Sequence, residues 1–173
     1  IRDNGWQDKF EKALQNALSY NVKDFDDIKS LEDYFNWLDA QLSWVPVENY
    51  YGTIVYQHVA KFYFILDQEP VKSLQNAVTP SDTMRPLTKL SAWMRKYVDA
   101  LGAWMDQPQS ITKESVQSFY ASPIYNMDEY DQPRGGWKSF NEMFARRTKP
   151  GCRPIADAND DTVIVADADS TFD

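Results

Sequence analysis

Histidine and cysteine are almost absent from this chain of 173 residues, which contains one of each, His58 and Cys152. A single cysteine excludes an internal disulfide framework, and a single histidine excludes metal sites built on several imidazole ligands. Long apolar runs are missing as well, and none approaches the roughly 20 residues that a membrane-spanning helix needs. Because a signal-peptide pattern is also missing, we expect a soluble, cytoplasmic protein, with peripheral membrane association left open.

Basic residues are in the minority, with 18 Lys and Arg against 26 Asp and Glu, for a net charge of −8. This balance disfavours nucleic acids as partners, because they reward a basic face. The charge is unevenly spread: residues 134–153 carry six basic side chains and one acidic one, whereas residues 154–173 carry six aspartates and no base. The change falls near the Pro- and Gly-containing stretch 132–136, so we predict two regions, 1–130 and 131–173.

Apolar residues recur at spacings of three and four over most of the first region, which predicts helices. Three such stripes are strong, over residues 31–45, 54–66 and 87–105, and weaker ones cover 7–19, 71–77 and 112–120. Ser30 and Asp33 are spaced like a capping box at the start of the first stripe, and Pro46 ends it. Aromatic residues make up 14 % of the chain, so we predict a mainly α protein, a helical bundle with an aromatic-rich core. His58 is interpreted as a hydrogen-bonded structural residue.

The second region has a different pattern. Ser139 and Glu142 form a capping-box spacing, which predicts a short helix over 140–147 with Phe140, Met143 and Phe144 facing inward. The β-branched run 162–165 predicts one short strand, followed by the acidic residues Asp167 and Asp169.

Residues 140–155, FNEMFARRTKPGCRPI, resemble the FNEFFxRxLKPGxRPI segment of the phosphatidylserine decarboxylase family. The sequence DADS at 167–170 stands where that family carries PADG or PADS after a strand. Residues 34–44, 52–77 and 87–107 resemble, more loosely, the N-terminal helical domain of the branch that includes tryptophan decarboxylases. The resemblance therefore implies an N-terminal helical domain, 1–130, and then the first short helix and strand of an α+β decarboxylase domain, 131–173.

The family resemblance implies a pyruvoyl-dependent decarboxylase that cleaves its own chain at a Gly-Ser-Thr motif. The serine there becomes a pyruvoyl group, which serves as the electron sink when CO₂ leaves. An Asp, a His and that Ser carry out the cleavage, and the family's Asp falls on Asp169, with Asp167 as second choice. His58 does not match the family's His, and Ser170 is not preceded by Gly. We therefore expect an N-terminal portion that is inactive alone and whose partner is the remainder of its own decarboxylase domain.

Two charged clusters have competing interpretations. The basic residues 146, 147, 149 and 153 could bind a phosphate headgroup, but pairing with the acidic tail or with neighbouring elements is the interpretation we favour. The aspartates at 157, 160, 161, 167 and 169 do not have the spacing of a calcium loop. No metal site is therefore predicted.

The substrate class follows from charge. A net charge of −8 and the lack of a basic amphipathic helix favour a free aromatic amino acid such as tryptophan over phosphatidylserine. A homo-oligomer is left open. The alternative function is a non-catalytic helical interaction or regulatory domain formed by residues 1–130.

Overall fold

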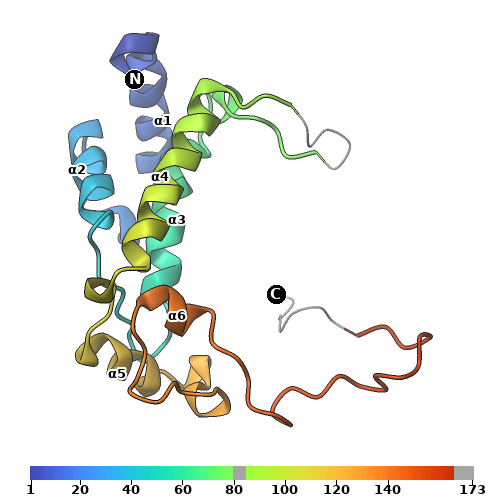
Figure 1. Ribbon diagram of the computed structural model, residues 1–173. Coiled ribbons are helices and arrows are strands. Elements are labelled where there is room, and N and C mark those ends of the chain that lie inside the picture. The colour runs from blue at the N-terminus through green and yellow to red at the C-terminus, as the bar shows by residue number, and fades with distance from the viewer. Residues whose placement is uncertain (80–84, 166–173) are drawn as a thin grey trace.

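The computed structural model describes residues 1–79 and 85–165, and its regular elements within these residues are helices (Figure 1). The α-helices are α1 (Gln7–Ser19), α2 (Leu31–Gln41), α3 (Ile54–Leu66), α4 (Lys89–Met105), α5 (Lys113–Ala121) and α6 (Phe140–Phe144). Single 3₁₀ turns precede α1 or lie between the helices: Arg2–Asn4, Lys23–Phe25, Lys72–Leu74, Pro108–Ser110, Pro123–Tyr125 and Met127–Glu129. The prediction of a mainly α protein is confirmed.

The helix boundaries follow local sequence signals. The predicted capping box at α2 is present, since Asp33 N donates to Ser30 Oγ at 3.1 Å and Ser30 N donates to the Asp33 carboxylate at 2.8 Å. Helices α1 and α3 span their predicted residues. However, α2 ends at Gln41 rather than near residue 45, and the predicted helix 71–77 is only the 3₁₀ turn Lys72–Leu74.

Two apolar clusters form the interior. The first joins α1, α2, α3 and the beginning of α4, and the second joins the end of α4 with α5, α6 and the turn Met127–Glu129. Buried tyrosines tie the helices of the first cluster together, because the Tyr34 hydroxyl donates to the Phe62 carbonyl at 2.6 Å and the Tyr97 hydroxyl donates to the Leu38 carbonyl at 2.8 Å. Both tyrosines thus satisfy their polar ends inside an apolar core.

The predicted stripe on α3 is only partly buried. Phe62 and Leu66 belong to the core, whereas Val59 and Tyr63, apolar residues of the same predicted stripe 54–66, are 53 % and 45 % exposed. On α4, Val98 likewise stays 48 % exposed. The apolar stripe is therefore wider than the surface that neighbouring helices cover.

Two predictions for the second region are wrong. Helix α6 ends at Phe144, and that side chain is 67 % exposed rather than inward, because only Phe140 and Met143 reach the second cluster. Residues 162–165 form no strand, and Ile164 is 97 % exposed. A strand needs a neighbour for its backbone hydrogen bonds, and the part of the chain that the structure describes gives this run none.

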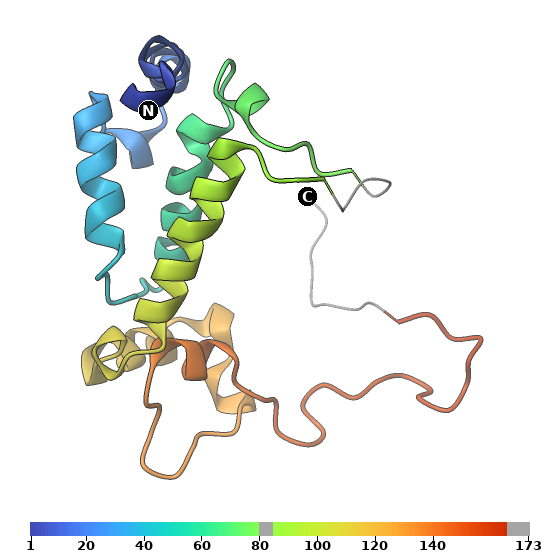
Figure 2. The ribbon, with the colours of Figure 1, turned by 45° about the horizontal axis from the view of Figure 1, so that its top comes forward.

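The segment that follows α6 leaves the helical body. In Figures 1 and 2, α2 lies on one side of the α3–α4 pair, and the segment that follows α6 extends away on the other side. Predicted residues Asp167 and Asp169 lie outside the described residues.

Candidate functional site

The segment that carries the family signature begins with a capped helix held against the helical body. Ser139 Oγ accepts from Glu142 N at 3.2 Å, as predicted, while the Glu142 carboxylate accepts from Lys138 N instead of closing the box on Ser139. Phe140 N donates to Ser110 Oγ at 2.9 Å, and the Phe140 ring lies 5.9 Å from that of Phe119. These contacts attach α6 to the turn Pro108–Ser110 and to α5.

After α6, residues 147–149 pair with residues 129–131, which lie some 20 positions earlier in the sequence. Asp131 N donates to the Arg147 carbonyl at 2.9 Å, and Lys149 N donates to the Glu129 carbonyl at 2.8 Å. Between them, Tyr130 and Thr148 form an antiparallel bridge. Residues 147–149 of the signature are therefore held by backbone hydrogen bonds against residues 129–131.

Basic side chains of the signature add to this attachment. Both Nε and Nη2 of Arg153 donate to one Glu129 oxygen, at 2.9 and 2.7 Å, and this pairing raises the pKa of the Arg153 guanidinium. Lys149 Nζ donates to the Asp128 carbonyl at 2.7 Å, and the Arg146 guanidinium lies 4.2 Å from the centre of the Tyr130 ring. The structure thus agrees with the interpretation that these cations pair with neighbouring elements.

A buried carboxylate joins the beginning of α3 to the turn Pro123–Tyr125. Glu48, only 7 % exposed, accepts from Ile54 N at 2.6 Å, from Val55 N at 3.2 Å and from the Tyr125 hydroxyl at 2.7 Å. Although burial raises the pKa of Glu48, the hydrogen bonds outweigh it and leave that pKa below its usual value. Burial of the Tyr125 hydroxyl, its hydrogen bond to Glu48 and the Glu48 charge all raise the pKa of Tyr125.

Sequence reasoning missed Glu48, because its partner Tyr125 lies 77 residues away and no local motif marks the pair. Both carboxylate oxygens accept hydrogen bonds from the protein, and they satisfy N–H groups that the first turn of a helix leaves without partners. Glu48 therefore has a structural role, which is to link the first turn of α3 to Tyr125, and not that of a catalytic base.

His58 also has a structural environment, as predicted. Its Nδ1 lies 2.6 Å from Gln41 Oε1, and its ring stacks on Trp44 with centroids 3.9 Å apart. Burial, with a contribution from the Lys61 charge, lowers the pKa of His58. These contacts place the histidine inside the helical body.

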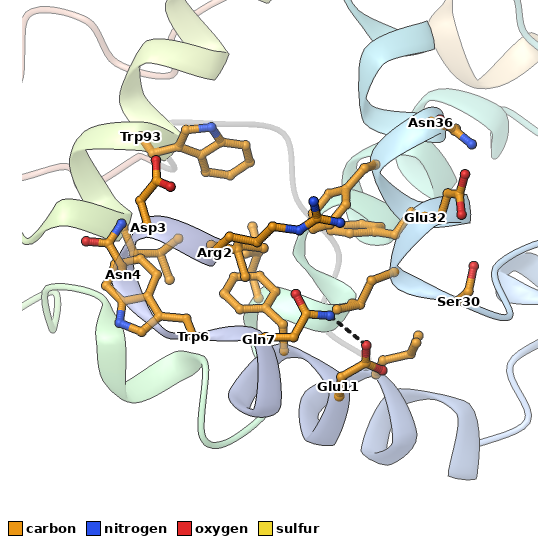
Figure 3. Close-up of a pocket in the computed structure, with 18 of the residues that line it drawn as sticks. Arg2, Asp3, Asn4, Trp6, Gln7, Glu11, Ser30, Glu32, Asn36 and Trp93 are labelled. Carbon is orange, nitrogen blue, oxygen red and sulfur yellow. Dashed lines mark hydrogen bonds between the residues drawn. The ribbon is translucent and has the colours of Figure 1, made fainter.

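A cavity of about 940 Å³ opens between α1, α2 and the beginning of α4 (Figure 3). Trp6 and Trp93 lie on one side of it, and Ser30, Glu32 and Asn36 lie along α2 on the other. Gln7 and Glu11 share a hydrogen bond of 2.8 Å at its rim. Its lining combines apolar walls with charges of both signs and includes neither the histidine nor the cysteine of the chain.

Within residues 1–79 and 85–165, no group of three or more His, Cys, Asp or Glu is arranged to hold a metal ion. Over the same residues, no helix combines the length and apolar character needed to cross a bilayer. Cys152 is exposed in the turn after the signature helix.

The chain is similar to phosphatidylserine decarboxylase proenzymes from several organisms. The chain is 36 % identical over 83 residues to phosphatidylserine decarboxylase proenzyme 3 of Schizosaccharomyces pombe, covering 48 % of this chain and 8 % of that protein. It is 49 % identical over 45 residues to phosphatidylserine decarboxylase proenzyme 2 of Oryza sativa, covering 26 % and 7 %. With the phosphatidylserine decarboxylase proenzyme of Fusobacterium nucleatum, identity is 41 % over 76 residues, covering 43 % and 24 %.

No family model and no solved structure matches the chain. The chain spans at most 24 % of the length of these three relatives. Tryptophan decarboxylases do not figure among these matches, so that finer part of the predicted resemblance stays a prediction. The similarity that the comparisons support is to a part of phosphatidylserine decarboxylase proenzymes.

Proposed function

We propose that this chain is the N-terminal portion of a self-processing, pyruvoyl-dependent decarboxylase. The observation that carries the proposal is its similarity to phosphatidylserine decarboxylase proenzymes from a yeast, a plant and a bacterium. A proenzyme is by definition processed, and a cut in the chain is the event that would create the pyruvoyl group. The structure adds a physical role for the signature residues, which attach the chain after α6 to the helical body.

In this proposal the attachment positions the chain that leads to Asp169. A carboxylate there would orient a histidine of the downstream chain and stabilise its positive charge during self-cleavage. Asp167 is the second candidate for this role. His58 is not the histidine that would pair with Asp169 or Asp167, since its ring is stacked on Trp44 within the helical body.

The pyruvoyl group would come from a serine outside this chain, and it would supply the electron sink for loss of CO₂. The described residues offer no Ser–His–carboxylate arrangement, because the chain's one histidine contacts Gln41 and Trp44. This chain therefore contributes structure and the candidate aspartate, and it is expected to be inactive alone.

Two substrates share the required chemistry, a carboxylate next to a primary amine. The relatives are named for phosphatidylserine, which makes that lipid the first candidate. A free aromatic amino acid such as tryptophan is the second, favoured by the net charge of −8, which disfavours an anionic lipid surface.

The decisive experiment uses the complete polypeptide that contains these residues. Mass spectrometry is expected to find two chains, the second blocked at its N-terminus by pyruvoyl. Release of CO₂ from phosphatidylserine in mixed micelles and from free tryptophan then separates the two substrates. A single uncut chain that releases no CO₂ would refute the enzyme and favour the alternative, a helical interaction or regulatory domain.

A further inference from the structure

One face of α3 is apolar and open to solvent. Tyr56, Val59 and Tyr63 are 72 %, 53 % and 45 % exposed, and spacings of three and four place them on the same side of the helix. The outer face of α1 is very different, since its exposed residues include Asp8, Lys9, Glu11 and Lys12. A solvated helix face is normally polar, so α3 carries a surface suited to contact with another protein body.

This face points away from α2. Lys61 pairs with Asp27 and lies 5.4 Å from the Trp37 ring centre, which fixes the side of α3 that looks toward α2. At about 100° per residue, Val59 and Tyr63 lie roughly opposite Lys61. Figures 1 and 2 show the segment after α6 on this same side of the α3–α4 pair. The open face of α3 and the chain that leaves α6 thus share one side of the molecule.

Apolar side chains at the end of α6 and in the segment after it are also exposed. Phe144, Ile155 and Ile164 are 67 %, 68 % and 97 % exposed, and the β-branched run 162–165 has no neighbouring strand among the described residues. A body that paired with this run would lie on the same side of the α3–α4 pair as the open face. The relatives hold ample chain for such a body, since the matched part is at most 24 % of their length.

We infer that the open face of α3, formed by Tyr56, Val59 and Tyr63, is the docking surface for the remainder of the decarboxylase domain. This inference rests on the proposed function, because that function supplies the docking body. The face carries no charge, so the matching surface is apolar, with polar groups for the two tyrosine hydroxyls. Docking there would hold the catalytic part against the helical body independently of the covalent connection.

The test separates the two parts of the complete polypeptide and asks whether they stay together. A site for a specific protease is inserted in the exposed turn 157–161, the protein is cut there, and the dissociation constant of the two parts is measured. Val59→Asp and Tyr56→Glu place a charge on the face, while Gln15→Asp places the same kind of charge on the exposed side of α1. Circular dichroism checks that each variant keeps its helices.

The unmodified parts are expected to remain associated after the cut. Each α3 variant should weaken association about tenfold or more, as for a charge placed in the centre of an interface, and Gln15→Asp should leave it within about twofold. Equal binding by all variants, or separation of the unmodified parts, would overturn the inference. So would light scattering that shows two copies of the chain joined through this face.

The proposed function and the docking surface are tested by different measurements. Mass spectrometry of the same samples detects the pyruvoyl group, whereas the dissociation constant reports docking. Parts that hold together through α3 without pyruvoyl would retain the docking surface and refute the decarboxylase. A processed enzyme whose parts associate equally well in the α3 variants would support the decarboxylase and refute the docking surface.

Discussion

At the scale of single residues, two ionisable side chains, Glu48 and His58, connect neighbouring segments through hydrogen bonds. Glu48 connects the first turn of α3 to Tyr125, and His58 connects α3 to Gln41 at the end of α2. The folded-state pKa of each group is lowered, so the stability of the fold should depend on pH through these two groups.

Glu48→Gln is expected to lower the free energy of unfolding at pH 7 by about 2 kcal/mol, because charge-assisted hydrogen bonds to two N–H groups and a hydroxyl are weakened. Tyr125→Phe, which removes one of these bonds, should cost about 1 kcal/mol. Since the folded-state pKa of Glu48 lies below its ordinary value, its contribution is present above the unfolded pKa and disappears as pH falls through the folded pKa. Urea unfolding at pH 7 and pH 3 measures both; a Glu48→Gln cost that is unchanged at pH 3 would contradict the assignment.

His58 should make the protein less stable in mild acid. Its folded pKa is lowered by burial, so the unfolded chain binds the proton first, and stability falls as pH drops from about 6.5 toward the folded pKa. Because His58 is the chain's one histidine, His58→Phe should remove the difference in unfolding free energy between pH 7.5 and pH 5.5. Denaturant titrations at the two pH values check this, and an unchanged difference in the variant would assign it to other groups.

Asp169 lies outside the described residues and carries the catalytic prediction. In the complete polypeptide, Asp169→Asn should block self-cleavage, since a neutral amide cannot stabilise a protonated histidine, whereas Asp167→Asn should be cleaved normally. Gel electrophoresis after expression distinguishes one chain from two. Normal cleavage of the Asp169 variant together with a block in the Asp167 variant would move the role to Asp167.

At the scale of elements, the beginning of α3 depends on a close approach between distant segments. Gly52 has φ +69° just before the helix, and a Cβ added there would lie 2.5 Å from Ile124 Cγ2. Gly5 has a similar φ of +63° with open space around it. Comparing an alanine substitution at each glycine therefore distinguishes the cost of backbone strain from the cost of steric overlap.

Gly5→Ala is expected to cost about 1 kcal/mol of unfolding free energy from the left-handed backbone alone. Gly52→Ala should cost about 2–4 kcal/mol, since overlap with Ile124 is added to the same strain. Combining Gly52→Ala with Ile124→Ala should recover part of that difference, and thermal or urea unfolding measures all three. Equal costs at the two glycines would show that the turn Pro123–Tyr125 moves freely away from α3.

At the scale of the whole molecule, α3 and α4 run through both apolar clusters. Phe62 of α3 and Tyr97 of α4 belong to the first cluster, whereas Val55 of α3 and Met105 of α4 belong to the second. The Trp104 indole also donates to the Trp44 carbonyl at 2.7 Å, and both tryptophans pack against the second cluster. Helices shared in this way should make the clusters unfold together.

Leu66→Ala in the first cluster and Met143→Ala in the second remove fully buried side chains, 0 % and 1 % exposed. Each is expected to cost about 2–5 kcal/mol and to shift one common transition. Far-ultraviolet circular dichroism and tryptophan fluorescence followed in urea should therefore give the same midpoint in both variants. Two separated transitions in either variant would show that the clusters are independent units.

Much of the helical fold could be predicted from the sequence because helix signals are local. The spacing of apolar residues located α1 and α3, and the Ser30–Asp33 box located the beginning of α2, since the interacting groups are three or four residues apart. Of the candidate site, the order of residues 140–155 was enough to indicate the family resemblance, and Asp169 and Asp167 remain predictions.

What only the tertiary structure decided is which surfaces are covered. Val59 and Phe62 belong to one apolar stripe, yet the first is 53 % exposed and the second 8 %, because burial depends on neighbours that the stripe does not specify. The run 162–165 shows the same limit, as a strand requires a second chain segment for its hydrogen bonds. Local sequence determined the helices, whereas contacts between distant residues, such as Glu48 with Tyr125 and Arg153 with Glu129, determined how they are joined and which face stays open.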